Sequence, residues 1–185
     1  MKSSLAVVLF APAVLAQTET APPPVLTENG FDCFLSTPEL RDAVDAYLDD
    51  PSQGTATVQK YGWPIGNWCV RNIADFSYLF DVNRNPKAAT FNEDLTGWVT
   101  TSARDMSFMF AGAASFNGDV SKFQTGRVLK MPGMFEDAIS FNRDVSQWDV
   151  FNVRDFERIF REAIAFTGDI SSWDMRCVET NSTLF

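Results

Sequence analysis

Four aspartates at a fixed spacing are the residues of this chain best placed to do chemistry together. Starting from Asp94, the residues Asp119, Asp144 and Asp169 each follow the previous one by 25 positions. Carboxylates gathered in one column could hold calcium, which takes about six to eight oxygen ligands. One aspartate per unit is few for such an ion, so the pattern favours carboxylates that accept backbone N–H bonds in tight turns. Calcium held between units is the alternative.

A hydrolase that uses acids such as Asp119 and Asp144 is the third interpretation. It ranks last, because acids stacked in register on one side of a repeat do not flank a substrate bond. The chain also has no histidine, the commonest general acid or base and the commonest metal ligand. We therefore expect no catalysis and no cofactor. A second column contains a lysine, so it is not expected to bind metal ions. It consists of Asp75, Asp105, Lys130 and Asp155.

Three cysteines and one sequon are the remaining candidates for chemistry. Cys33 and Cys69 could form a disulfide between the N-terminal segment and the first repeat, or remain two thiols. Cys177 is the third cysteine and has no partner in this arrangement. Asn181 begins an Asn-Ser-Thr sequon, a candidate glycosylation site in a eukaryotic source.

The aspartates belong to a segment that the chain repeats four times. Phe-Asn-Arg-Asp-Val-Ser-Gln-Trp at 141–148 has counterparts at 91–98, 116–123 and 166–173. Residues 61–80 form a degenerate first unit, and five extra residues within 81–87 predict a surface loop. A fixed period of this length predicts stacked units with like positions about 4.8 Å apart.

In such a stack the aromatic side chains form columns, which we expect to be core rather than an exposed sugar platform. The three expected columns are Phe91, Phe116, Phe141 and Phe166; Phe80, Phe110, Phe135, Phe160 and Phe185; and Trp68, Trp98, Phe123, Trp148 and Trp173. Short parallel strands are expected at Val99–Met106, Val128–Met131 and Val150–Phe156, with single helical or 3₁₀ turns near Phe110, Phe135 and Phe160.

An amphipathic helix precedes the repeats. Ser36-Thr37-Pro38-Glu39 has the residues of a helix start, and Pro51 ends the helix. Its apolar stripe consists of Leu40, Ala43, Val44, Tyr47 and Leu48. A lone helix of this length is marginal in water, so we expect it to cap the open end of the stack.

The expected organisation has four parts. Residues 1–16 read as a signal peptide, 17–30 as a Pro/Thr-rich linker, 31–58 as the capping-helix region, and 59–185 as about five repeats, the last one incomplete. No later stretch is apolar enough to span a membrane, so none is expected in the mature chain. The incomplete unit favours a fragment of a longer protein; alternatively, an uncapped last unit could associate end to end with another molecule.

The repeated Phe-Asn-x-Asp-(Val/Ile)-Ser-x-Trp, followed by a valine, an Asp-Met or Asp-Phe pair and a Met-Phe, resembles the BspA-like leucine-rich-repeat surface proteins. These include 25- to 26-residue repeats of mycoplasma and Listeria lipoproteins and related secreted algal proteins. The resemblance runs from about Phe34 to Phe185 and implies an α/β repeat, a right-handed leucine-rich-repeat-like solenoid, at the cell surface. Unlike the lipoproteins, the chain has no lipobox cysteine after its signal.

The expected function follows from this architecture and resemblance. With 24 acidic and 15 basic residues, a formal net charge of −9 argues against binding to nucleic acid or to anionic membranes. The leading hypothesis is a secreted or cell-surface interaction or adhesion protein that presents an extended face to an extracellular protein or glycan. A calcium-stabilised extracellular structural module is the alternative.

Overall fold

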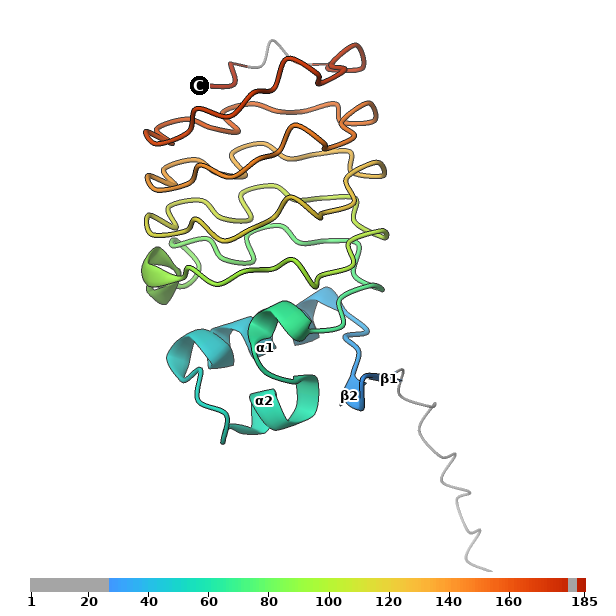
Figure 1. Ribbon diagram of the computed structural model, residues 1–185, viewed down its shortest axis with the longest axis vertical. Helices are drawn as coiled ribbons and strands as arrows, with labels where there is room; N and C mark the ends of the chain where they lie inside the picture. The colour runs from blue at the N-terminus through green and yellow to red at the C-terminus, as the bar shows by residue number, and fades with distance from the viewer. Residues whose placement is uncertain (1–26, 180–182) are drawn as a thin grey trace, which may run out of the picture.

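The computed structural model describes residues 27–179 and 183–185, and its regular elements lie near the N-terminus (Figure 1). Strands β1 (Thr27–Glu28) and β2 (Phe31–Asp32) form an antiparallel hairpin. Helices α1 (Thr37–Asp49) and α2 (Ala56–Tyr61) follow, and then the 3₁₀ helices η1 (Ile65–Asn67) and η2 (Pro86–Thr90). The expected signal peptide at 1–16, most of the expected linker, and Asn181 lie outside the described residues.

The expected leucine-rich-repeat-like solenoid with parallel strands is wrong. The described residues contain one sheet, the two-stranded antiparallel β1–β2, and no strand at Val99–Met106, Val128–Met131 or Val150–Phe156. Only isolated parallel bridges link Asp75, Asp105, Lys130 and Asp155. The segments near Phe110, Phe135 and Phe160 are hydrogen-bonded turns rather than helices. Sequence periodicity shows that equivalent positions recur, but it does not show whether the backbone between them is extended.

The chain after η1 instead runs mostly as irregular layers that lie on one another (Figure 1). Backbone N–H groups of one layer donate to carbonyls of the next at alternate residues. Phe76, Tyr78 and Phe80 donate to Asp105, Ser107 and Met109 at 2.8, 2.9 and 2.7 Å. Because turns interrupt these ladders every few residues, the layers are joined without forming continuous strands.

The interior of the layers confirms the predicted aromatic columns. Phe116 and Phe141 are 6.0 Å apart with ring planes 2° from parallel, and Phe110 and Phe135 are 5.6 Å apart at 1°. Stacking also links Phe123 to Trp148 at 6.4 Å. Trp68 departs from its column, because it packs against Phe34, Tyr47 and Tyr61 of the N-terminal segment. All three columns are largely buried, so core is the correct interpretation.

Helix α1 forms where the sequence predicted an amphipathic helix. Ser36 is its N-cap, and the Ser36 hydroxyl accepts the Glu39 N–H at 3.3 Å. Leu40, Ala43, Val44 and Tyr47 are buried in the same core as the first layers, so α1 covers their N-terminal end. The short helix α2 was not anticipated. Thr55 caps it, since its hydroxyl accepts the Val58 N–H, and it packs against α1 and β2.

One position of the repeat has a left-handed backbone in each of four successive layers. It is occupied by Tyr78 (φ 58°), Phe108 (φ 54°), Gly133 (φ 56°) and Arg158 (φ 59°). Glycine adopts this conformation without steric cost, whereas a residue with a Cβ pays roughly 1–2 kcal/mol. The winding of the layer therefore fixes the backbone, while the residue that occupies the position differs from layer to layer.

Candidate functional site

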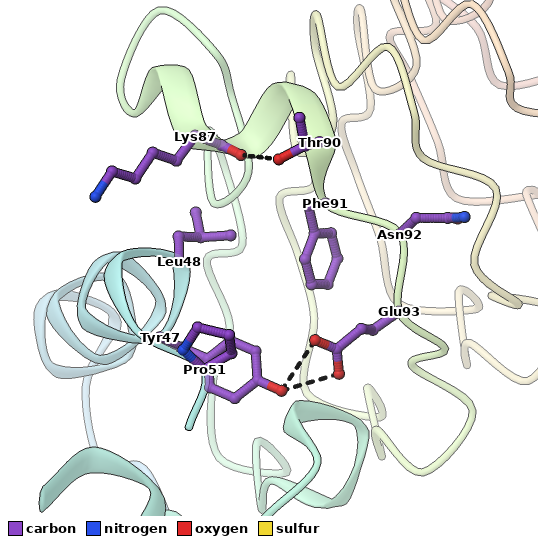
Figure 2. Close-up of a pocket in the computed structure, with 8 residues that line it drawn as sticks. All are labelled: Tyr47, Leu48, Pro51, Lys87, Thr90, Phe91, Asn92 and Glu93. Carbon is purple, nitrogen blue, oxygen red and sulfur yellow. Dashed lines mark hydrogen bonds between the residues drawn. The ribbon is translucent and has the colours of Figure 1, made fainter. Parts of the chain in front are cut away.

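A pocket opens where the C-terminal end of α1 meets the first complete unit (Figure 2). It encloses about 300 Å³ between Leu48 and Pro51 on one side and Phe91 and Glu93 on the other. The Tyr47 hydroxyl donates to both carboxylate oxygens of Glu93 at 2.9 Å. Burial, reinforced by the Glu93 carboxylate, raises the pKa of Tyr47 far above its ordinary value.

The charged groups of this junction pocket are already paired with protein. Lys87 Nζ donates to Asp49 Oδ1 at 2.7 Å, and Glu93 holds the Tyr47 hydroxyl. A ligand would have to compete with these contacts. We therefore interpret this pocket as part of the packing interface between α1 and the layers, and not as a ligand site.

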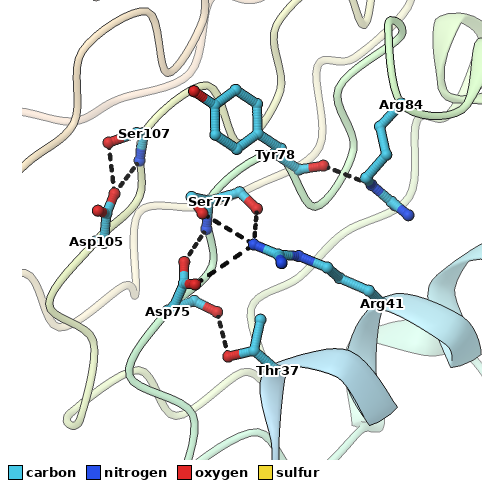
Figure 3. A network of polar contacts seen from close by, with 8 residues as sticks. All are labelled: Thr37, Arg41, Asp75, Ser77, Tyr78, Arg84, Asp105 and Ser107. Carbon is cyan, nitrogen blue, oxygen red and sulfur yellow. Dashed lines mark hydrogen bonds and ion pairs between the residues drawn. The ribbon is translucent and has the colours of Figure 1, made fainter.

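The first half of α1 is fixed by a polar network on its other flank (Figure 3). Arg41 Nη2 donates to the Ser77 carbonyl at 2.8 Å and to the Ser77 hydroxyl at 2.9 Å, and lies 3.4 Å from Asp75 Oδ2. The Thr37 hydroxyl donates to the Asp75 carbonyl at 2.9 Å. These contacts position the segment that leads into Tyr78.

The predicted surface loop at 81–87 also holds α1. Arg84 Nη1 lies 2.5 Å from Asp45 Oδ2, and Asn85 Nδ2 donates to Asp45 Oδ1 at 2.8 Å. The insertion was predicted to be a surface loop, but its contact with α1 was not predicted. Acidic residues on the helix and basic residues in the insertion were a signal that could have linked the two.

The column of Asp94, Asp119, Asp144 and Asp169 consists of turn and interlayer acceptors. Asp119 Oδ1 accepts the Ser121 N–H at 2.8 Å, and the same bond recurs from Ser146 to Asp144 and from Ser171 to Asp169 at 2.9 Å. These backbone N–H bonds hold the pKa of all three carboxyls below the ordinary value. Asp94 differs, because its Oδ1 accepts the Asp119 N–H at 2.8 Å.

Asparagines beside this column link adjacent layers. Asn92 Oδ1 accepts the Asn117 N–H at 2.7 Å, Asn117 Oδ1 accepts the Asn142 N–H at 3.0 Å, and Asn142 Oδ1 accepts the Thr167 N–H at 2.9 Å. These amides therefore join one layer to the next. In the described part of the chain, no three His, Cys, Asp or Glu side chains are gathered so that they could hold a metal ion.

The cysteines divide as one bonded pair and one thiol. Cys33 and Cys69 form a disulfide, which joins the segment before α1 to the first layer, and their backbones also form a parallel bridge. Cys177 is a half-buried free thiol.

A second pocket is lined by two aromatic side chains, the exposed Tyr78 and the half-buried Phe108. Tyr78, with 43% of its surface exposed, stacks on Phe108 at a ring-centroid distance of 5.2 Å and an interplanar angle of 13°. On the next layer Gly133 makes room for Phe108, since a Cβ at Gly133 would collide with the Phe108 ring. This pair was not predicted, although Tyr78 and Phe108 occupy the same position of the matching segments 72–80 and 102–110.

The pocket beside this pair has a volume of about 360 Å³ and spans parts of three layers. Its polar lining comes from Asp81, Asn83, Glu136 and Asp137. Asp81 Oδ1 is held by the Asn83 N–H at 3.0 Å, and Glu136 Oε1 accepts Arg161 Nη1 at 2.8 Å. Within the described chain, no hydrogen bond of the Asp137 carboxylate or of the Tyr78 hydroxyl is observed. We call this cavity the Tyr78–Phe108 pocket.

Fold and surface together define a protein of stacked layers with a helical cap and an aromatic, polar pocket on the outside. A family model described as "Mycoplasma protein of unknown function, DUF285" matches residues 56–128 and 83–185. The chain therefore belongs to this family. Comparisons with curated proteins and with solved structures give no match. None of the helices in the described ranges has the length and apolar character that a membrane crossing requires.

Proposed function

We propose that the protein is a secreted or cell-surface interaction protein, related to the BspA-like surface proteins, which binds an extracellular protein or glycan through the outer face of its layers. The family match supports a surface-repeat context, and the repeated Phe-Asn-x-Asp motif supports the relationship. Export agrees with the N-terminal signal pattern and with the Cys33–Cys69 disulfide, since such bonds persist in oxidising compartments.

One observation carries the proposal: a backbone position that the core holds constant carries a different residue in each of four layers, and Tyr78 is exposed there. The left-handed position carries Tyr78, Phe108, Gly133 or Arg158 in successive layers. The aromatic columns and interlayer hydrogen bonds support the backbone from inside, so these outer residues are not needed to build the core. A rigid scaffold with variable outer side chains is the arrangement that binding surfaces use.

Catalysis is not part of the proposal. The carboxylates of the acidic column are engaged as backbone acceptors along one side of the layers, and they do not face one another across a cleft. Glycosidases need two carboxyl groups on either side of the scissile bond.

A glycan array combined with a pull-down from extracellular proteins tests the function. The mature chain should retain at least one glycan or extracellular protein, and retention should survive moderate salt. A chain that is folded by circular dichroism yet captures nothing in either assay contradicts the proposal.

A further inference from the structure

We propose that the Tyr78–Phe108 pocket binds an uncharged pyranose ring of a glycan. This inference rests on the proposed interaction function, and it adds the site and the class of ligand. The volume of the pocket, about 360 Å³, falls within the usual range for small-molecule sites, roughly 300–1,000 Å³.

The aromatic side chains provide the apolar half of the site. Tyr78 is 43% exposed although it stacks on Phe108, so its ring remains available to a ligand. Aromatic faces carry partial negative charge, which attracts the slightly positive C–H groups on the face of a sugar ring. Phe108 is held between Tyr78 and the backbone of Gly133, so the pair is fixed before a ligand arrives.

The polar lining provides acceptors for sugar hydroxyl groups. Asp81 is only 5% exposed and is oriented by Asn83, whose N–H and side-chain amide both donate to Asp81 Oδ1. Asp137 is exposed, and among the described residues no protein donor occupies its carboxylate. A sugar that donates hydroxyl hydrogens to such carboxylates would form charge-assisted hydrogen bonds.

Charge restricts the class of sugar. Three carboxylates, from Asp81, Glu136 and Asp137, line the pocket, and the whole chain carries a formal net charge of −9. Uronic acids, sialic acids and sulfated sugars would be repelled. A basic peptide is the competing occupant, but Arg158 and Arg161 already approach Glu136 at 3.7 and 2.8 Å, which reduces the pocket's attraction for a cation. The mixed aromatic and acceptor lining fits a neutral sugar better.

The backbone supplies a variant that removes the aromatic surface without harming the fold. Tyr78 has φ 58°, a conformation that suits glycine, and Gly133 occupies the equivalent position two layers on. Tyr78→Gly therefore relieves the left-handed strain while it removes the ring. A matched pair tests the acceptor: Asp137→Asn lies in the pocket, and Glu162→Gln lies 25 residues on, outside the pocket, with nearly the same left-handed φ (58° and 56°).

The experiment measures binding of the full mature chain to four neutral hexasaccharides, cellohexaose, laminarihexaose, chitohexaose and mannohexaose, and to hexa-arginine, by isothermal titration calorimetry. We expect one or more of the hexasaccharides to bind. Tyr78→Gly and Asp137→Asn should each weaken that binding about tenfold or more, whereas Glu162→Gln should change it by less than about twofold. Melting temperatures check that all variants are folded.

Each other outcome overturns the inference in a distinguishable way. If a hexasaccharide binds equally to the wild type, Tyr78→Gly and Asp137→Asn, the glycan site lies elsewhere and the proposed function stands. If only hexa-arginine binds, with loss in Asp137→Asn, the pocket takes a basic peptide. If no probe binds, the sugar assignment fails, and the proposed function fails as well only if the array and pull-down also capture nothing.

Discussion

Lys130 stands where neighbouring layers have aspartate, and Pro132 explains the exchange. In those layers the aspartate accepts the N–H of the residue two positions on, as Asp105 Oδ1 accepts the Ser107 N–H at 2.9 Å and Asp155 Oδ1 accepts the Glu157 N–H at 2.9 Å. Proline has no N–H. A carboxylate at position 130 would therefore have no N–H to accept from residue 132. Both positions keep their place in the layer, because Lys130 still bridges Asp105 and Asp155 and the Pro132 carbonyl accepts the Phe108 N–H at 2.9 Å.

This relationship predicts that Lys130→Asp and Pro132→Ser are coupled. Lys130→Asp alone should not stabilise the protein, and Pro132→Ser alone should lose the rigidity of proline. Together they recreate the pair seen at Asp105 and Ser107. We expect a favourable coupling free energy of about 1 kcal/mol in a double-mutant cycle measured by urea unfolding. Additive effects of the two substitutions would show that the Asp–N–H bond does not set the choice at position 130.

The aromatic columns predict a large difference between two phenylalanines. Phe135 is fully buried and its ring lies 3.8 Å from Phe141, 5.6 Å from Phe110 and 5.8 Å from Phe160. Phe135→Ala should lower the free energy of unfolding by about 3–5 kcal/mol. Phe151→Ala is the control, because Phe151 is 43% exposed, and its cost should be below about 1 kcal/mol. Similar losses in urea unfolding would contradict the columns as the main source of stability.

The insertion after the first layer predicts a role for Asp45. Its carboxylate receives Arg84 on one oxygen and Asn85 on the other. Asp45→Ala should destabilise the protein by about 1 kcal/mol, because a partly exposed ion pair and a hydrogen bond are lost together. Asp42→Ala on the same helix is the matched control, since Asp42 is exposed and no side-chain bond of it is seen in the described chain. Equal melting temperatures for the two variants would count against the insertion as a clamp on α1.

Bound calcium should not change stability. Asp119, Asp144 and Asp169 each use a carboxylate oxygen for a backbone N–H in their own turn, so few oxygens are left in one place for an ion that wants about six to eight. We expect the same melting temperature with millimolar calcium as with a chelator. A rise in melting temperature that saturates with calcium would support the calcium-stabilised module instead.

Side-chain stacking could be predicted from the sequence, but the backbone that carries it could not. Phe116 and Phe141 recur at one spacing, and apolar residues at equal phase must share an environment, so their stacking followed directly. The sequence between them is equally compatible with strands and with successive turns. Left-handed residues such as Phe108 break the ladder into turns, and an aromatic residue gives no sign that it will adopt a positive φ.

The candidate site was harder to predict because its residues come from different layers. Asp81 lies in the insertion, Phe108 in the next unit and Asp137 in the unit after that, so only the stacking register brings them together. The acidic residues predicted from the sequence, Asp94, Asp119, Asp144 and Asp169, all share one position of the repeat. The pocket instead combines neighbouring phases of the repeat: Tyr78 shares its position with Phe108, Asp81 with Glu136, and Val82 with Asp137.

The lowered pKa values of the turn aspartates predict how stability depends on pH. The Ser121 N–H bond is the largest cause that holds the pKa of Asp119 below its ordinary value, and the Ser146 and Ser171 N–H groups do the same for Asp144 and Asp169. A carboxyl with a lower pKa in the folded state than in the unfolded state contributes its stabilisation fully above the unfolded pKa, about 3.9. That contribution disappears as the pH falls through the folded pKa.

Replacing all three residues by asparagine keeps an oxygen acceptor but removes the titration. Urea unfolding between about pH 4 and pH 2 should therefore show a smaller loss of stability in the Asp119→Asn, Asp144→Asn, Asp169→Asn variant than in the wild type. An identical loss in both proteins would mean that other carboxyls account for the acid sensitivity of the fold.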